Sequence, residues 1–292
     1  MELSGYQLNV LIVAALYVLM AVGLQLTTGY AGQISLGQAG FYALGAYAAA
    51  LAATRAGWPF LATLPLSVLV AGAAGALSGL PSLRVRDDFL AIVTLGIGLI
   101  VQSLANGLPL TGGAMGISAI PPATIGAMSL DLTGYALLVG VITLLGVAVA
   151  WWLSRSQLGL LWRALRDDDL AAAAAGVNVP ALKLSAFAIG CSYAGLAGCL
   201  LTYHLGFIGA DSFGFSVSTT VLAMIVVGGL GSLRGAVIGA LALSLLPELL
   251  RPVAGARLAL YGALLALVTT YGRGGLARLR LPAMLRRPAD PT

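Results

Sequence analysis

The stretch GYAGQISLGQAGFYALGAY, residues 29–47, decides how this chain folds, because it places polar and helix-weakening residues where an apolar helix would otherwise continue. Its five glycines, at positions 29, 32, 37, 40 and 45, are irregularly spaced and interleaved with Gln33, Ser35 and Gln38. Helix packing needs small residues but not two amides, and an unpaired amide in lipid costs about a few kcal/mol. A helix break or re-entrant turn lining a polar path explains both features. A short cytoplasmic loop between two spans is the alternative interpretation.

The composition is that of a membrane protein. Hydrophobic residues make up 60% of the 292 residues and charged residues only 9%, and the mean hydropathy is +1.00. So much apolar surface cannot be hidden in one globular core. A spanning helix needs about 20 apolar residues, and nine stretches approach this length: 8–28, 36–53, 60–80, 88–106, 132–153, 184–203, 215–232, 235–250 and 257–271. We therefore expect one all-α polytopic membrane domain over residues 1–292 with about 8–10 transmembrane helices.

The charge distribution predicts the orientation. The first basic residue is Arg55, so the segment 8–28 is predicted to be a retained helix rather than a signal peptide. Placing the basic tail, residues 272–292, in the cytoplasm puts 12 of the 15 Lys and Arg residues on that side, as the positive-inside rule requires. We expect the N-terminus outside. The basic residues form no basic face, so the bilayer, not nucleic acid, is the expected partner.

One long charged connection is expected in the cytoplasm, SRSQLGLLWRALRDDDLAAAAAGVNVPALK at residues 154–183. Its residues 160–176 are strong helix formers and predict one short helix outside the bilayer. Gly176 suits a left-handed C-cap, and Pro180 suits the start of the next helix. A solvated connector and a docking surface for a partner both fit this pattern.

The sequence argues against chemistry within this chain. A GxxxxGK[ST] phosphate loop is missing, and Asp131, Asp211 and Glu248 fall at predicted span ends rather than inside the membrane. One histidine and two cysteines exclude an HExxH zinc site. We expect no enzyme activity, no metal and no cofactor here, so any energy source belongs to another subunit. A second irregular stretch, residues 106–122, is rich in Gly, Pro and Thr and predicts a non-helical outer loop.

Five ordered stretches together resemble the M-type permease subunits of ABC importers for branched-chain amino acids. They cover nearly the whole chain and are TGYAGQISLGQAGFYALGAYAAALAA at 28–53, RVRDDFLAIVTLGIG at 84–98, TGGAMGI at 111–117, LWRALRDDDLAAAAAGVNVPALKLSAFAIG at 161–190, and the segment 194–250. The resemblance implies a multi-pass protein of the bacterial inner membrane. It also implies four partners: a second permease, two cytoplasmic ATPase subunits that bind ATP and magnesium, and an extracytoplasmic binding protein.

The resemblance also implies roles for particular residues. The loop that contacts the ATPase in the family corresponds here to Arg163, Arg166, Asp167, Asp168, Asp169, Gly176 and Asn178. The resemblance also supports a role in the translocation path for five residues of the glycine-rich stretch: Gly32, Gln33, Ser35, Gly37 and Gln38. The substrate stays open, because similar permeases handle branched-chain or other amino acids, urea or short amides. A stand-alone channel or facilitator is the alternative of a different class, and it would need no docking loop.

Overall fold

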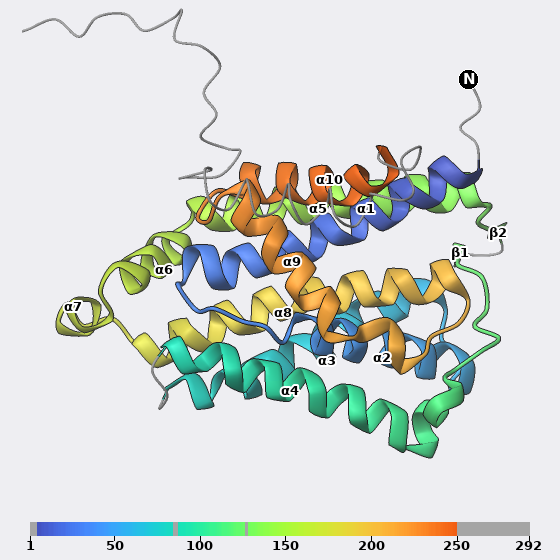
Figure 1. Ribbon diagram of the computed structural model, residues 1–292, viewed down its shortest axis with the longest axis horizontal. Coiled ribbons are helices and arrows are strands. Elements are labelled where there is room, and N and C mark those ends of the chain that lie inside the picture. The colour runs from blue at the N-terminus through green and yellow to red at the C-terminus, as the bar shows by residue number, and fades with distance from the viewer. Residues whose placement is uncertain (1–4, 84–86, 126–127, 250–292) are drawn as a thin grey trace, which may run out of the picture.

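The computed structural model describes residues 5–83, 87–125 and 128–249, and the chain there is almost entirely helical (Figure 1). The long elements are α1 (Gly5–Leu24), α2 (Gln38–Arg55), α3 (Phe60–Gly79), α4 (Asp87–Gly107), α5 (Leu132–Arg155), α6 (Gln157–Asp167), α7 (Asp169–Ala174), α8 (Val179–Leu205), α9 (Phe215–Gly228) and α10 (Leu233–Leu249). The short ones are a π-helix, η1 (Gln25–Tyr30), and four 3₁₀ turns, η2 (Pro81–Leu83), η3 (Pro109–Thr111), η4 (Gly113–Met115) and η5 (Ala210–Phe213). Within these ranges the only strands are β1 (Thr124–Ile125) and β2 (Met128–Ser129), which pair antiparallel. The predicted all-α fold is confirmed.

Eight of the nine predicted spans correspond to described helices. The ninth, 257–271, and the tail 272–292 lie outside the described residues. Six of the described helical segments are long and apolar enough to cross a membrane. Helix α9 is shorter than predicted, with 14 residues or about 21 Å of axial rise, and it reaches span length only together with η5, over Ala210–Gly228. It ends where the chain turns through Gly229 and Gly231, both at positive φ, so the predicted span 215–232 is not one continuous helix.

Helix α8 is the central element of the bundle. It packs against α3, α2 and α1 and lies between α1 on one side and α2 and α3 on the other in Figure 1. Bulky side chains are excluded from its contact with α2, because a Cβ placed on Gly45 would lie 2.2 Å from the carbonyl oxygen of Gly195. Small residues let transmembrane backbones approach in this way. Cys191 and Cys199 are buried free thiols on α8.

The predicted irregular loop, 106–122, is irregular in the structure. It consists of η3, η4 and extended backbone, with Gly112, Gly113 and Gly116 at positive φ. Ile117 pairs with Ile208 through two backbone hydrogen bonds of 2.9 and 3.0 Å. The loop is therefore attached to the segment between α8 and η5, at the end of the bundle opposite α6 and α7 (Figure 1).

Substituting Gly45 with alanine tests the close contact between α2 and α8. The added methyl group would meet backbone, which cannot rotate away, so we expect Gly45→Ala to destabilise the fold by about 1–3 kcal/mol. The measurement is the thermal unfolding midpoint of the protein in detergent. Gly140→Ala on α5 is the matched control, because no heavy atom lies within 4 Å of its added Cβ. Equal midpoints for the two variants would contradict the packing account.

Candidate functional site

The polar stretch between the first two helical segments is largely buried inside the bundle. Helix α1 continues into the π-helix η1, and the chain then runs without regular structure through residues 31–37 before α2 begins. Gln25, Gln33, Ser35 and Gln38 are all at most 2% exposed. The predicted non-helical turn is therefore present and largely buried, and because it connects two helices, the alternative of a short loop between the first two spans stays open. π-helical turns are rare and are frequently found at functional sites.

Gly32 and Gly37 shape this break. Gly32 adopts φ +76°, a backbone conformation that residues other than glycine rarely adopt. A Cβ at this position would lie 3.0 Å from Arg166 Cγ. Gly37 precedes α2, and its Cβ would lie 2.6 Å from the carbonyl oxygen of Thr94. The Gly37 N–H donates to Ser35 Oγ over 3.4 Å. Both glycines thus allow neighbouring elements to approach the chain.

Hydroxyl groups from two other helices accept hydrogen bonds from the backbone at this break. The Leu36 N–H donates to Thr94 Oγ1 of α4 over 3.0 Å, and the Ala39 N–H donates to Ser218 Oγ of α9 over 2.9 Å. These bonds satisfy donors that the unwound chain cannot satisfy itself. The sequence analysis missed both Thr94 and Ser218, because a lone hydroxyl in an apolar helix is a weak signal when its partner is unknown.

The amide side chains at the break make further contacts. Gln38 Nε2 donates to the Met20 carbonyl over 3.4 Å, and Gln25 Nε2 donates to the Gly229 carbonyl over 3.2 Å. Gln25 was not among the predicted site residues, although its Oε1 is buried without a hydrogen-bond partner. The cavity beside the break, lined in part by Leu36 and Ser218, has a volume of about 10 Å³, which is room for about one water molecule. The path role of the predicted residues stays a prediction.

The predicted coupling segment forms two helices, not one. It breaks at Asp168, whose carboxylate accepts hydrogen bonds from the N–H groups of Leu170 and Ala171 at 2.9 and 3.0 Å. Asp168 is therefore the N-cap of α7, a position that aspartate favours over a helix interior. The prediction of a single helix over 160–176 is wrong for this reason. Helix α7 projects from one end of the bundle (Figure 1), and Leu170 on it is 79% exposed.

The two arginines of α6 are exposed but bond back to neighbouring elements. Arg166 Nη1 donates to the Gly29 carbonyl in η1 over 2.5 Å. The Arg163 guanidinium lies 5.0 Å from the Tyr30 ring centroid and donates to the Ser154 carbonyl over 3.0 Å. Trp162, fully buried, donates to Ser185 of α8 over 3.1 Å. Helix α6 is thus bonded both to the central helix and to η1, directly before the non-helical segment 31–37.

The other predicted coupling residues have roles in local structure. Asn178 caps α8, its Oδ1 accepting from the Ala181 N–H over 3.1 Å, and Gly176 has the predicted positive φ, +84°. Asp169 forms an ion pair of 3.4 Å with Lys183. Asp167 is exposed at the end of α6. These contacts order the turn between α7 and α8 and leave a docking role untested.

Basic side chains gather at the end of the bundle that carries α6. Arg155, Arg163 and Arg234 line one cavity of about 250 Å³ there, while Arg55, bonded to the Leu110 carbonyl over 2.8 Å, lies at the opposite end with the 106–122 loop. Residues 84–86 lie outside the described residues. Within the described chain, no group of three or more His, Cys, Asp or Glu residues is placed to hold a metal ion.

The fold defines a multi-pass membrane protein in which a buried, non-helical segment connects the first two helical segments, a feature that transporters use where backbone lines a cavity. Residues 6–270 match the family model described as the branched-chain amino acid transport system / permease component. The chain belongs to that family.

Individual relatives are also named as permease proteins of branched-chain amino acid transport systems. The chain is 35% identical to the high-affinity branched-chain amino acid transport system permease protein LivM of Salmonella typhimurium, over 92% of this chain and 69% of the relative. Its likeness to LivM of Escherichia coli has the same identity and coverage. The permease protein LivH of Escherichia coli is 26% identical over 78% of this chain and 80% of LivH. No solved structure matches the chain.

Ser218→Ala tests the hydroxyl support of the break. It leaves the buried Ala39 N–H without its acceptor, and we expect a loss of stability of about 1–3 kcal/mol, the cost of an orphaned buried donor. The readout is the thermal unfolding midpoint in detergent. Thr219→Ala is the control on the same helix, because that hydroxyl donates only to carbonyls of its own helix. A midpoint for Ser218→Ala as high as that of the control would show that the bond contributes nothing.

Proposed function

We propose that this chain is the permease subunit of an ATP-driven importer of branched-chain amino acids, with its N-terminus outside and its C-terminus in the cytoplasm. It forms part of the translocation path and is not itself an enzyme. Separate ATPase subunits bind ATP and magnesium, a second permease completes the path, and an extracytoplasmic binding protein delivers the substrate. The observation that carries the proposal is the bond from Arg166 to Gly29, because it joins the predicted docking segment to the predicted path.

The contacts support a mechanism in which motion of α7 is passed to the break. Helix α7 offers an exposed apolar surface of Leu170 and alanines at the tip of the bundle. Helix α6 directly precedes α7 in the chain and bonds to Gly29 through Arg166. ATPase closure that displaces α7 would therefore shift η1 and the 31–37 segment, whose hydroxyl partners lie on α4 and α9. The energy comes from nucleotide binding, because a ligand shifts an equilibrium only by its differential affinity for the two states.

The interior of the bundle supports a substrate without net charge. Among the residues whose side chains the structure describes, Lys183 is the only buried Asp, Glu, Lys or Arg, and it lies near the start of α8. Helix α2 begins inside the bundle, and a zwitterion can be held by such helix ends and backbone groups. The names of the relatives favour branched-chain amino acids. Other amino acids, urea or short amides remain alternatives within the same transport class.

A stand-alone channel is less well supported. Such a protein needs a continuous polar path through its own fold, whereas the cavity beside the break measures only about 10 Å³. It would also need no exposed apolar helix at its tip. A path shared with a second permease accounts for the small cavity, and ATPase docking accounts for the exposed helix.

Competition assays with the assembled complex test the substrate and the class together. The tagged chain is purified gently from its native membrane, retained proteins are identified by mass spectrometry, and uptake of labelled leucine is measured in vesicles. We expect a second permease and P-loop ATPases in stoichiometric amounts, and competition by isoleucine and valine but not by urea. Competition by urea alone would identify urea, rather than branched-chain amino acids, as the substrate. Recovery of the chain alone, under conditions that preserve a known importer, would favour the channel.

Leu170→Glu tests docking through α7. Burying a leucine in a partner contributes about 1.5–3 kcal/mol, so a charge there should weaken ATPase binding tenfold or more (about 1.4 kcal/mol per tenfold). Co-purification of the ATPase subunits, titrated against their concentration, measures the effect. The control is Leu110→Glu, which introduces the same charge at another exposed leucine (51% exposed), located at the opposite end of the bundle. Equal affinity for the two variants would move the docking surface away from α7.

Arg166→Gln tests coupling separately from docking. The side chain bonds to Gly29 in η1 and the exposed face of α7 is unchanged, so ATPase subunits should still bind, whereas a charge-assisted bond of about 1.5–3 kcal/mol to Gly29 is lost. We expect leucine uptake per ATP hydrolysed to fall about tenfold. Uptake and phosphate release are measured on the same vesicles. An unchanged ratio would show that the bond to Gly29 does not transmit the motion.

A further inference from the structure

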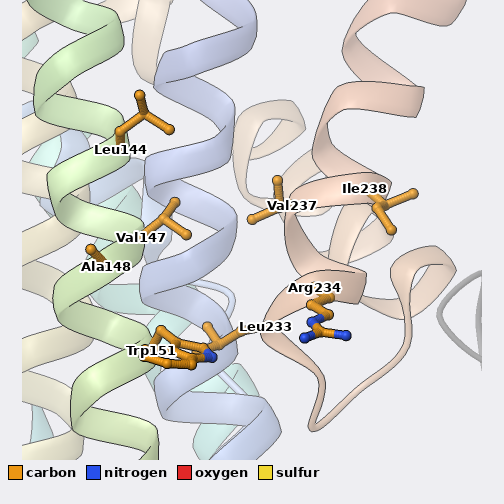
Figure 2. Close-up of a pocket in the computed structure, with 8 residues that line it drawn as sticks. All are labelled: Leu144, Val147, Ala148, Trp151, Leu233, Arg234, Val237 and Ile238. Carbon is orange, nitrogen blue, oxygen red and sulfur yellow. The ribbon is translucent and has the colours of Figure 1, made fainter.

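An apolar groove runs along the outside of the bundle between α5 and α10 (Figure 2). Helix α1 lies between these two helices and contacts both. The groove has a volume of about 450 Å³ and is lined by Leu144, Val147 and Ala148 from α5 and by Leu233, Val237 and Ile238 from α10. Leu144 is 71% exposed and Ile238 is 48% exposed, so the groove is open along its length.

A basic cavity adjoins the groove at the end that carries α6. It has a volume of about 250 Å³ and shares Trp151, Leu233 and Arg234 with the groove. Arg155 and Arg163 complete its cationic lining. In Figure 2, Trp151 and Arg234 lie together at one end of the groove, while the apolar side chains continue away from them.

The three arginines present unneutralised charge to this cavity. The Arg155 guanidinium lies 4.0 Å from the centre of the Trp151 ring, and Arg163 lies over Tyr30. The described lining residues include no carboxylate. In the described part of the chain, no ion pair involves any of the three arginines. The cavity therefore carries a formal charge of +3 and fits an anion.

The tryptophans indicate the depth of the cavity in the membrane. Trp151 and Trp152 are 47% and 67% exposed at the end of α5, and exposed tryptophans are enriched at the level of lipid headgroups. The groove then extends from this level along α5 and α10 toward the bilayer centre. A cationic cavity at headgroup depth that continues into an apolar groove has the shape and polarity of one phospholipid.

We propose that the groove between α5 and α10 binds an anionic phospholipid, with its phosphate held by Arg155, Arg163 and Arg234 and one acyl chain lying against Ala148 and Val237. A free phosphate would need the arginines but not the groove, and a helix of a second permease would need the groove but not three cations. Because Arg163 belongs to α6 and Arg155 ends α5, a bound headgroup connects the two helices at their junction. The proposal does not depend on the transported substrate.

Native mass spectrometry of the full chain tests the headgroup site. The protein is released from mixed micelles that contain phosphatidylglycerol and phosphatidylcholine with identical acyl chains. We expect selective retention of one phosphatidylglycerol, and about thirtyfold weaker retention after Arg155→Gln and Arg234→Gln together, since each basic residue near an anionic headgroup contributes about 1 kcal/mol. The control, Arg286→Gln with Arg287→Gln, removes the same charge from the C-terminal tail. Equal losses in the two double variants would overturn the proposal.

A second pair of variants tests the acyl chain. Ala148→Phe fills the groove, whereas Val149→Phe places the same ring on the next, 54% exposed residue of α5, which does not line the groove. We expect only Ala148→Phe to lower phosphatidylglycerol retention, with unchanged unfolding midpoints for both. Full displacement of the lipid by inorganic phosphate would assign a free-anion site instead. If a second permease co-purifies and covers the groove while no lipid is retained, the groove would be assigned to the interface between the two permeases instead.

Discussion

The close approach of α8 to α2 is the contact on which the rest of the structure depends. Inside a bilayer, lipid tails are as apolar as the side chains, so helices associate through tight packing rather than through the hydrophobic effect. Gly45 brings α2 so close to the Gly195 backbone that a methyl group would not fit, and a Cβ on Gly195 itself would meet Ser67 and Ala71 of α3. Helix α8 makes a similar contact with α1, where a Cβ on Gly23 would lie 2.5 Å from the Gly190 carbonyl oxygen. Three of the first helices are thereby gathered around one axis.

This packing explains how an unwound segment can exist inside a membrane protein. Irregular backbone is tolerated at membrane depth only where protein or water satisfies its polar groups. With α2 held against α8, residues 31–37 lie next to α4 and α9, which supply the hydroxyls of Thr94 and Ser218. Arg166 adds a charged donor at the preceding turn, on the Gly29 carbonyl. Four helices, α2, α4, α6 and α9, therefore contribute hydrogen bonds at or next to residues 31–37. A displacement of any one of them changes the hydrogen bonding of this segment.

The candidate site could be predicted in part. Irregular glycines mixed with amides indicated the break, and a charged, alanine-rich stretch between apolar spans indicated the projecting helices. The inward contacts of Arg163 and Arg166 could not be predicted, because charges in a cytoplasmic loop are usually solvated and their partners lie more than 100 residues away in the chain. The division of the coupling segment at Asp168 reflects a local competition, between helix continuation and capping, that helix propensity summed over the segment does not capture.

The sequence by itself determined that this protein lies in a bilayer, that its fold is all-α and which family it belongs to. Hydropathy and the scarcity of charge require a bilayer, and the spacing of apolar stretches sets the helices, because each span must satisfy its own backbone. Only the tertiary structure decided which polar groups meet. Thr94, Ser218 and Arg166 come from three different helices and converge on one broken segment. The physical reason is that a hydrogen bond acts over about 3 Å, so its partners are defined by how the helices pack and not by their separation along the chain.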